Sequence, residues 1–268
     1  MTLDEACKSS GIDRLEAEVL LADLLGKDRT WLLAHGSEDI GTHADQALQR
    51  FRDRKTGMPV AYITGKKEFC GRMFAVSPGI LIPRESTENL LNLAWDVLHG
   101  STGDCIRTLD DGIAGVVRIF RPQLQPELLV DVGTGSGCIG ITLSLETSMP
   151  VIATDSSMDA VAAAKQNAVR LGAEITVEHG DCLNPLREIR KPFLVVSNPP
   201  YIPEGTVLSS EVVDFEPRSA LFSGEDGSEV LRKILQQAEE HPCCVGVVLE
   251  CGEKQAALCF PSAQTSTL

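Results

Sequence analysis

The sequence predicts an α/β protein whose parallel sheet is covered by helices on both faces, with a small helical unit ahead of it. Three observations support this prediction. From residue 128 onward, short apolar segments alternate with stretches of helical periodicity, and these segments lack the polar alternation of a half-exposed strand. Before residue 58, apolar residues follow helical spacing instead. The length of 268 residues suits one medium domain with a small partner.

The N-terminal part is predicted to be helical. Apolar residues at positions 12, 15, 19, 20 and 24 recur at helical spacing. Gly26 is placed to end this helix, because glycine readily adopts the left-handed conformation found after a helix C-terminus. Residues 31–34 and 44–54 indicate two more short helices. We therefore assign residues 1–57 to an N-terminal helical domain.

Residues 58–84 are predicted to be a β-hairpin connector. Residues 60–65 and 69–76 are rich in β-forming residues and are punctuated by glycine, which predicts two paired strands. Prolines at positions 78 and 83 then interrupt the chain before a helix predicted at 87–98. Residues 99–127 contain Gly, Asp and Pro without clear periodicity, so we expect a linker or insertion there.

The remaining segment, within residues 85–268, carries the alternation of strands and helices. Strands are predicted at residues 128–132, 151–154, 175–177, 193–197 and 245–249, and helices at 138–145, 158–171 and 229–240. Strands of this kind, separated by helices, predict a Rossmann-like parallel sheet.

Composition favours a soluble protein. No apolar run reaches the roughly 18 residues of a membrane span, and the N-terminus lacks the features of a signal or transit peptide. We expect a cytoplasmic monomer with no membrane partner, and leave an organellar location open. The nine cysteines, at positions 7, 70, 105, 138, 182, 243, 244, 251 and 259, form no Cys-x-x-Cys pair, so we expect reduced thiols and no metal site.

The net charge of −14 argues against a nucleic-acid duplex as the main partner, because such binding depends on neutralising phosphates. Basic residues nevertheless gather between positions 50 and 72. They are Arg50, Arg52, Arg54, Lys55, Lys66, Lys67 and Arg72. This segment predicts either a local basic patch or an ordinary solvated helix face.

A glycine-rich turn follows the strand at 128–132 and predicts a nucleoside pocket. Its residues are Asp131, Gly133, Thr134, Gly135, Ser136 and Gly137. The spacing of Gly135, Gly137 and Gly140 also matches a dinucleotide fingerprint, but a carboxylate at Asp131 would repel a pyrophosphate at the helix N-terminus. S-adenosyl-L-methionine has no phosphate, and its positive charges suit an adjacent carboxylate. We therefore predict this cofactor.

Three further residues are candidates for cofactor binding. Asp155 ends the next strand, where a carboxylate accepts hydrogen bonds from both ribose hydroxyls. Its alternative role, an N-cap for the following helix, is one that Ser156 and Ser157 can fill. Asp181 and Cys182 follow the third strand and are placed to border the adenine, although a plain turn explains the Gly-Asp pair equally well.

The sequence Asn198-Pro199-Pro200-Tyr201 ends the apolar strand at 193–197 and predicts a site for a planar amino group. An amide nitrogen is a poor nucleophile because its lone pair is delocalised. The Asn198 side-chain oxygen and the Pro199 carbonyl can accept both of its N–H bonds and aim the lone pair at a methyl donor, which is catalysis by positioning and electrostatics. Tyr201 would pack on the planar group. A rigid strand-ending turn is the alternative interpretation.

Taken together, these motifs resemble the HemK/PrmC family of glutamine N5-methyltransferases that modify peptide chain release factors. The resemblance is carried by residues 18–26, 31–35, 59–65, 68–69, 81–84, 131–137, 198–202, 216–218 and 224–227. It implies a class I methyltransferase domain over residues 85–268, a substrate-recognition role for residues 1–57, and S-adenosylhomocysteine as the product. It also implies that Gly133 to Gly137, Asp155, Cys182 and Asn198 line the cofactor site and that Asn198 to Tyr201 hold the glutamine.

Three departures from the family pattern stand out. Residues 84–88 read Arg-Glu-Ser-Thr-Glu where the family usually has Arg-Pro-Glu-Thr-Glu, and residues 99–127 exceed the usual connector. After residue 255 the family continues through a last helix and an antiparallel strand pair, so we expect one edge of the sheet to be left unpaired.

The leading hypothesis is methylation of the glutamine of a Gly-Gly-Gln motif in a release factor. The alternatives are a ribosomal-protein glutamine methyltransferase, an adenine-N6 methyltransferase, which shares Asn-Pro-Pro-Tyr, and a catalytically silent paralogue that only binds the release factor. The acidic catalytic half weighs against the adenine alternative.

Overall fold

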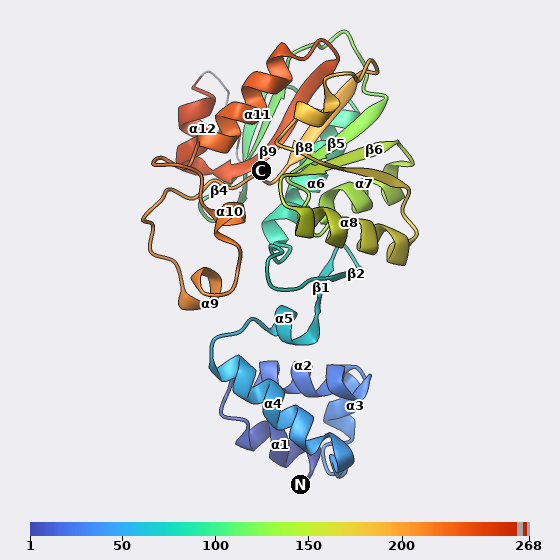
Figure 1. Ribbon diagram of the computed structural model, residues 1–268, viewed down its shortest axis with the longest axis vertical. Helices are drawn as coiled ribbons and strands as arrows, with labels where there is room; N and C mark the ends of the chain where they lie inside the picture. The colour runs from blue at the N-terminus through green and yellow to red at the C-terminus, as the bar shows by residue number, and fades with distance from the viewer. Residues whose placement is uncertain (262–264, 267–268) are drawn as a thin grey trace. The chain divides into compact units, whose positions relative to one another are not determined.

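The computed structural model describes residues 1–261 and 265–266. Contacts divide the chain into two compact units (Figure 1). The helical unit comprises Met1–Lys66, Val76–Pro78 and Leu208–Phe215, and the sheet unit comprises Lys67–Ala75, Gly79–Val207 and Glu216–Leu268. Within the described residues, no helix is both long and apolar enough to cross a membrane.

The helical unit contains α1 (Leu3–Ser9), α2 (Arg14–Leu25), α3 (Arg29–Ala34), η1 (Gly41–His43), α4 (Ala44–Lys55), α5 (Val60–Thr64) and, from a distant segment, α9 (Ser210–Val213). Of these, α2, α3 and α4 correspond to the three predicted helices. Asp13 caps α2, its side chain accepting hydrogen bonds from Leu15 N and Glu16 N, and Gly26 ends the helix with φ +63°, as predicted. Fully buried Leu20 and Leu21 pack with Phe51 in the core of this unit.

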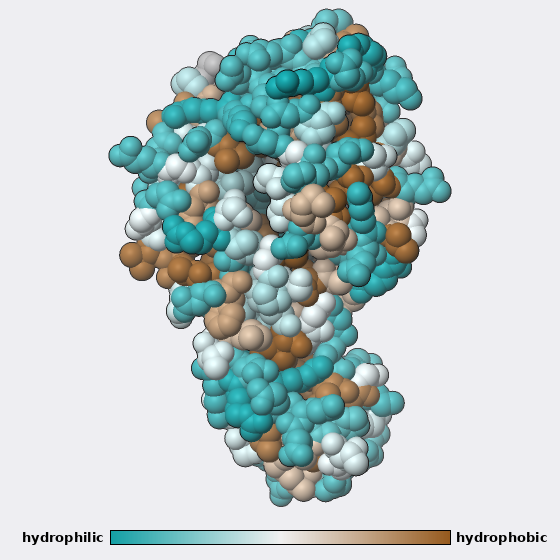
Figure 2. Space-filling model, in the orientation of Figure 1, coloured by the Kyte–Doolittle hydropathy of each residue, from teal (hydrophilic) through white to brown (hydrophobic). Residues whose placement is uncertain are grey.

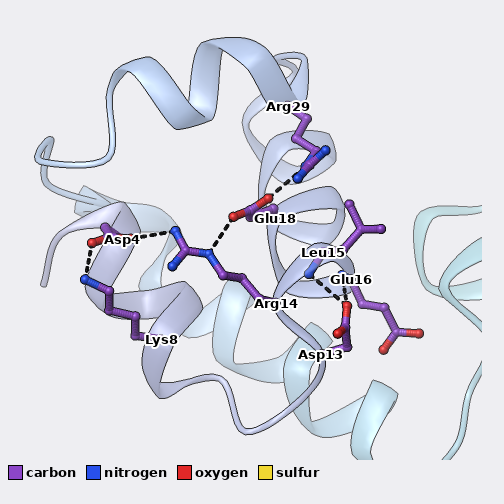
Figure 3. Close-up of polar contacts among 8 residues, drawn as sticks. All are labelled: Asp4, Lys8, Asp13, Arg14, Leu15, Glu16, Glu18 and Arg29. Carbon is purple, nitrogen blue, oxygen red and sulfur yellow. Dashed lines mark hydrogen bonds and ion pairs between the residues drawn. The ribbon is translucent and has the colours of Figure 1, made fainter.

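Buried charge is paired within the helical unit (Figure 3). Glu18 is only 3% exposed, and its two oxygens accept hydrogen bonds from Arg14 Nε at 2.8 Å and Arg29 Nε at 2.7 Å. These hydrogen bonds hold the pKa of Glu18 below its usual value. Arg14 also reaches Asp4, so one arginine connects α1 with α2.

Four of the seven basic residues between positions 50 and 72 form ion pairs within the described part of the chain, namely Arg50, Arg54, Lys66 and Arg72. Arg50 pairs with Asp23 at 2.6 Å and Arg54 pairs with Glu16 at 2.8 Å and with Glu211 of α9 at 3.1 Å. These guanidinium groups neutralise neighbouring carboxylates, so they contribute little to a free basic surface. The ion pairs favour an ordinary solvated helix face over a local basic patch.

The predicted strand at residues 60–65 is wrong, because these residues form α5. Pro59 precedes the helix and Gly65 ends it with φ +71°. These boundary residues favour a short helix and outweigh the β propensity of the residues between them. The hairpin lies slightly later, as β1 (Lys66–Phe69) and β2 (Arg72–Ala75), with Cys70 and Gly71 both at positive φ in the turn.

The sheet unit confirms the predicted α/β fold. Its strands are β3 (Cys105–Asp110), β4 (Ile113–Ile119), β5 (Leu128–Val132), β6 (Val151–Asp155), β7 (Ile175–His179), β8 (Phe193–Ser197), β9 (Cys244–Gly252) and β10 (Thr265–Ser266). They form one sheet in the order β10-β3-β4-β9-β8-β5-β6-β7. The pairs among β5 to β9 are parallel, and β4 runs antiparallel to both β3 and β9.

Helices cover both faces of this sheet (Figure 1). They are α6 (Glu85–Leu98), α7 (Cys138–Thr147), α8 (Met158–Leu171), α11 (Glu229–Glu240) and α12 (Glu253–Cys259). The unit also contains the short elements η2 (Asn184–Leu186) and α10 (Arg218–Leu221). Alternate strand residues face opposite layers: Leu129 packs in the layer with α6 and α7, and Val130 in the layer with α11 and α12. On the face seen in Figure 2, hydrophobic residues of this unit form small groups among hydrophilic ones.

Residues 99–127 were predicted to be a linker or an insertion, and the linker alternative is wrong for their central part, which makes the β3–β4 hairpin. β4 pairs with β9 along its length, with Val117 opposite Val248. The expectation of an unpaired sheet edge is therefore also wrong, since β4 covers β9 and β3 extends the sheet beyond it. Asp111 and Gly112 form the turn, with Gly112 at φ +70°.

Candidate active site

The glycine-rich turn connects β5 to α7 in a conformation that needs glycine. Gly133, Gly135 and Gly137 have φ values of +71°, +54° and +85°. The backbone N–H groups of Gly133 and Thr134 both donate to the carbonyl of Thr154 on β6, at 2.8 and 3.0 Å. A Cβ on Gly137 would lie 2.7 Å from Ile141 Cδ1, so this position has no room for a side chain. These contacts fix the conformation of the turn at the carboxyl ends of β5 and β6.

Asp131 stabilises the turn through hydrogen bonds to its side chain. The side chain is fully buried, and its Oδ2 accepts hydrogen bonds from Thr134 Oγ1 at 2.6 Å and Gly140 N at 2.8 Å. Desolvation raises the pKa of Asp131 to about 7. Asp131 is not among the residues that line the adjoining pocket, but its Oδ1 is buried without a partner among the described residues. That oxygen is a buried acceptor that the described residues leave unsatisfied next to the glycine-rich turn.

Asp155 ends β6 and faces the turn. Its Oδ2 accepts a hydrogen bond from Gly135 N at 2.9 Å, and its Oδ1 accepts one from Ser157 N at 2.8 Å. Burial raises the pKa of Asp155. Ser157, as expected, supplies the N-cap of α8 by accepting from Ala160 N. Asp155 is therefore not needed for capping, and it lines the pocket instead.

Asp181 and Cys182 also line the pocket, in the loop after β7. Asp181 forms an ion pair with Lys233 of α11, which lowers the pKa of the Asp181 carboxyl. Cys182 has φ +52°, and its carbonyl accepts a hydrogen bond from Thr154 Oγ1 at 3.0 Å. Burial raises the pKa of the Cys182 thiol to about 12, so at neutral pH it is a protonated wall residue rather than a nucleophile.

The pocket lies where the carboxyl ends of the parallel strands meet, which is the usual place for a ligand in this fold. Of the predicted residues, it is lined by Gly133, Thr134, Gly135, Ser136, Asp155, Asp181, Cys182, Asn198, Pro199 and Pro200. Further walls come from two other segments, with lining residues Gly79, Ile80, Leu81, Pro83 and Arg84 in the first and Pro217, Ser219 and Ala220 in the second. Asp131, Gly137 and Tyr201 are not among the lining residues.

Asn198 follows β8 directly, so the strand carries its side chain to the pocket. Its Nδ2 donates a hydrogen bond to Thr87 Oγ1 of α6 at 2.8 Å. Because the amide nitrogen is engaged there, the carbonyl oxygen Oδ1 is the end left for a ligand. Tyr201 is partly buried, and its hydroxyl donates to Glu250 Oε1 of β9 at 3.2 Å. Desolvation, together with this nearby carboxylate, raises the pKa of the Tyr201 phenol.

Sequence reasoning assigned no role to several residues that shape the site. Glu250 interrupts the apolar run of β9 and is fully buried, which was the available signal. Glu216 is also buried, and it accepts from Arg84 and from the backbone N–H of Ile82, which joins two walls of the pocket. Asn167 of α8 donates to the carbonyls of Ser136 and Ala75 and links the glycine-rich turn to β2.

Comparison with known proteins agrees with this arrangement. The family model described as the PrmC N-terminal domain matches residues 3–65, and the methyltransferase small domain matches residues 104–215. The release factor glutamine methyltransferase of Bacillus anthracis is 36% identical over 237 residues, which cover 86% of this chain and 76% of that protein. The proteins of the same name from Koribacter versatilis and Bacillus subtilis are 37% and 38% identical, with 75% and 82% of their lengths covered, against 85% and 92% of this chain.

The fold, the pocket and the matching domain define the protein as a methyltransferase. Identity with the curated relatives extends over most of both chains. The chain belongs to the release factor glutamine methyltransferase family.

Proposed function

We propose that this protein transfers a methyl group from S-adenosyl-L-methionine to the side-chain amide nitrogen of a glutamine in the Gly-Gly-Gln motif of a peptide chain release factor. The observation that carries the proposal is the orientation of Asn198. Its Nδ2 is tied to Thr87, so an amide oxygen faces the same pocket that Asp155 and the glycine-rich turn line.

The pocket suits the proposed cofactor. Asp131 does not line the pocket, but its Oδ1 is buried without a partner among the described residues, and a carboxylate beside the glycine-rich turn suits the positively charged methionine ammonium. Asp155 is held by two backbone N–H groups, and a carboxylate there suits the ribose hydroxyls. Asp181 and Cys182 border the position expected for the adenine. When bound, S-adenosyl-L-methionine supplies an electrophilic methyl group on a sulfonium sulfur.

Residues 198–201 are proposed to hold the glutamine amide. The Asn198 Oδ1 and the Pro199 carbonyl accept one N–H each, which localises the nitrogen lone pair. Prolines at 199 and 200 lack N–H groups, so the backbone there offers acceptors only. The amide nitrogen forms the new N–C bond as the S–C bond breaks, and one of its two protons then passes to water. S-adenosylhomocysteine and N5-methylglutamine are the products.

The helical unit supports a release factor as the substrate. The PrmC N-terminal domain family matches residues 3–65, and the relatives that share this region are named for release factor glutamine methylation. We propose that residues 1–57 recognise the release factor, that residues 58–84 connect them to the catalytic domain at 85–268, and that the protein acts as a cytoplasmic monomer.

A direct test is reaction of the full chain with methyl-labelled S-adenosyl-L-methionine and purified release factors. We expect one added methyl by intact-mass analysis, and peptide mapping should place it on the Gly-Gly-Gln glutamine. A release factor with that glutamine replaced by alanine is the matched control and should remain unlabelled. Absence of label on the glutamine, while calorimetry shows that the cofactor binds, would refute the proposal.

A further inference from the structure

A buried carboxylate lies behind the site and needs an explanation. Glu250 is fully buried in the apolar strand β9. Burial of an unpaired carboxylate costs several kcal/mol, so such a group persists only where hydrogen bonds satisfy it. Glu250 accepts three of them: Oε1 accepts from Ser86 Oγ at 3.0 Å and Tyr201 OH at 3.2 Å, and Oε2 accepts from Thr87 Oγ1 at 2.9 Å.

The direction of these hydrogen bonds determines how the Asn198 amide is oriented at the pocket. A hydroxyl can donate only one hydrogen bond, and the Thr87 hydroxyl donates its bond to Glu250. The Thr87 oxygen is then available only as an acceptor, and it accepts from Asn198 Nδ2 at 2.8 Å. The two ends of an asparagine amide have nearly the same shape, so packing alone does not choose between them. The acceptor at Thr87 selects the orientation in which Asn198 Nδ2 faces Thr87.

The choice matters for a glutamine amide in the pocket. With Oδ1 toward the pocket, Asn198 accepts an N–H of the incoming side chain. A reversed Asn198 would present its own N–H groups to those of the substrate, and neither could accept. Correct positioning of a reacting amide increases the reaction rate by large factors when only a few contacts hold that amide.

We propose that Glu250, acting through the Thr87 hydroxyl, is a positioning residue that fixes the Asn198 amide with its oxygen toward the substrate. Glu250 also holds the Tyr201 hydroxyl, so one carboxylate anchors both ends of the Asn-Pro-Pro-Tyr segment. This inference rests on the proposed glutamine methylation. It identifies Thr87 on α6 and Glu250 on β9 as residues on which the reaction depends, although Glu250 does not contact the substrate.

The test compares Thr87→Val with Thr87→Ser. Valine keeps the shape of threonine but removes the hydroxyl, so Asn198 Nδ2 loses its acceptor. We expect kcat for release factor methylation to fall about 10²-fold. Serine keeps the hydroxyl and should restore kcat to within a few-fold of wild type. The dissociation constant of S-adenosylhomocysteine, measured by calorimetry, should change little in either variant.

Two more variants separate positioning from folding. Glu250→Gln keeps the shape but offers one acceptor oxygen and one NH2. With the NH2 toward Thr87, the other two hydroxyl donors keep their acceptor, but the Thr87 proton loses its own. That proton can then be donated to Asn198 Oδ1, so the orientation of the Asn198 amide is no longer fixed. We expect a loss of kcat comparable with that of Thr87→Val. Ser86→Ala removes a donor to Glu250 that is not on the path to Asn198. Its loss of kcat should be several-fold smaller.

The outcomes distinguish this inference from the proposed function. If wild-type protein places no label on the glutamine, the proposed function fails and the inference fails with it. If wild type labels the glutamine and either Thr87→Val or Glu250→Gln retains wild-type kcat, only the inference is overturned. A loss in Thr87→Val that Thr87→Ser does not restore, or that appears equally in Ser86→Ala, also overturns it. If one variant fails to bind S-adenosylhomocysteine, the kcat of the remaining Thr87 or Glu250 variant decides between these outcomes.

Discussion

Gly115 of β4 packs directly against Leu93 of α6. A Cβ placed on Gly115 would lie 2.8 Å from Leu93 Cδ2 and 2.9 Å from Leu109 Cδ2. Both leucines belong to the buried layer between α6 and the sheet, so both side chains would have to shift within that layer to admit a Cβ. The absence of a side chain at this one position allows the helix to lie close to the β3–β4 hairpin.

Gly115→Ala should therefore destabilise the protein. Overpacking of a buried site costs about 1–3 kcal/mol, and we expect the free energy of unfolding to fall by that amount. Urea denaturation measures it. Gly103→Ala is the control, since nothing lies within 4 Å of a Cβ there. Equal stability of the two variants would contradict the close packing.

Asn198→Ala should abolish most turnover while leaving the cofactor site intact. The variant lacks the amide oxygen proposed to accept a substrate N–H, and loss of one preorganised polar contact of this kind costs about 10²–10³-fold in kcat. Single-turnover methylation of a release factor measures the effect, with calorimetric binding of S-adenosylhomocysteine as the control. Unchanged turnover would eliminate the amide-holding mechanism.

Asp155→Ala should weaken cofactor binding by about 1–3 kcal/mol, because charge-assisted hydrogen bonds to the ribose would be lost. Isothermal calorimetry with S-adenosyl-L-methionine provides the measurement. Asp159→Ala is a suitable comparison, as this residue lies in the first turn of α8 and is not among the lining residues. An unaltered dissociation constant for Asp155→Ala would exclude the ribose assignment.

Titration of Asp131 should contribute to the pH dependence of the free energy of unfolding. Its pKa is raised by burial from 3.8 to about 7, so between these values the folded protein holds a proton that the unfolded chain has released. Stability contributed by this group therefore falls as the pH rises from about 4 to about 7. Asp131→Asn removes the titration. We expect the free energy of unfolding of the variant, relative to wild type, to rise over this interval, and a flat difference would contradict the assignment.

The parallel part of the sheet was predictable because its strands are buried on both faces and read as unbroken apolar runs, as in residues 193–197. The hairpin at 105–119 was not, because Gly115 resembles a strand breaker until the packing of Leu93 explains it. The short helix α5 was missed because Val60 and Ile63 favour a strand locally, while Pro59 and Gly65 determine the outcome.

The candidate site divides along similar lines. Asp155 and Asn198 were found because each directly ends or follows a strand, and parallel strands bring their carboxyl ends together. Thr87 and Glu250 were not assigned, because their contact joins α6 to β9, elements far apart in the sequence. Only the tertiary structure shows that a hydroxyl and a buried acid meet behind Asn198.

The pairing of β4 with β9 also constrains how the protein forms during synthesis. β4 leaves the ribosome before β5, β6, β7 and β8, yet its lateral partner β9 follows all of them. One edge of the hairpin must therefore remain exposed on the nascent chain until residues 244–252 emerge, and contacts of such long range close slowly. Glu250 lies in that late strand. The anchor of the Asn-Pro-Pro-Tyr segment thus arrives after strands β1 to β8, and competence for methyl transfer should appear only when β9 has joined the sheet.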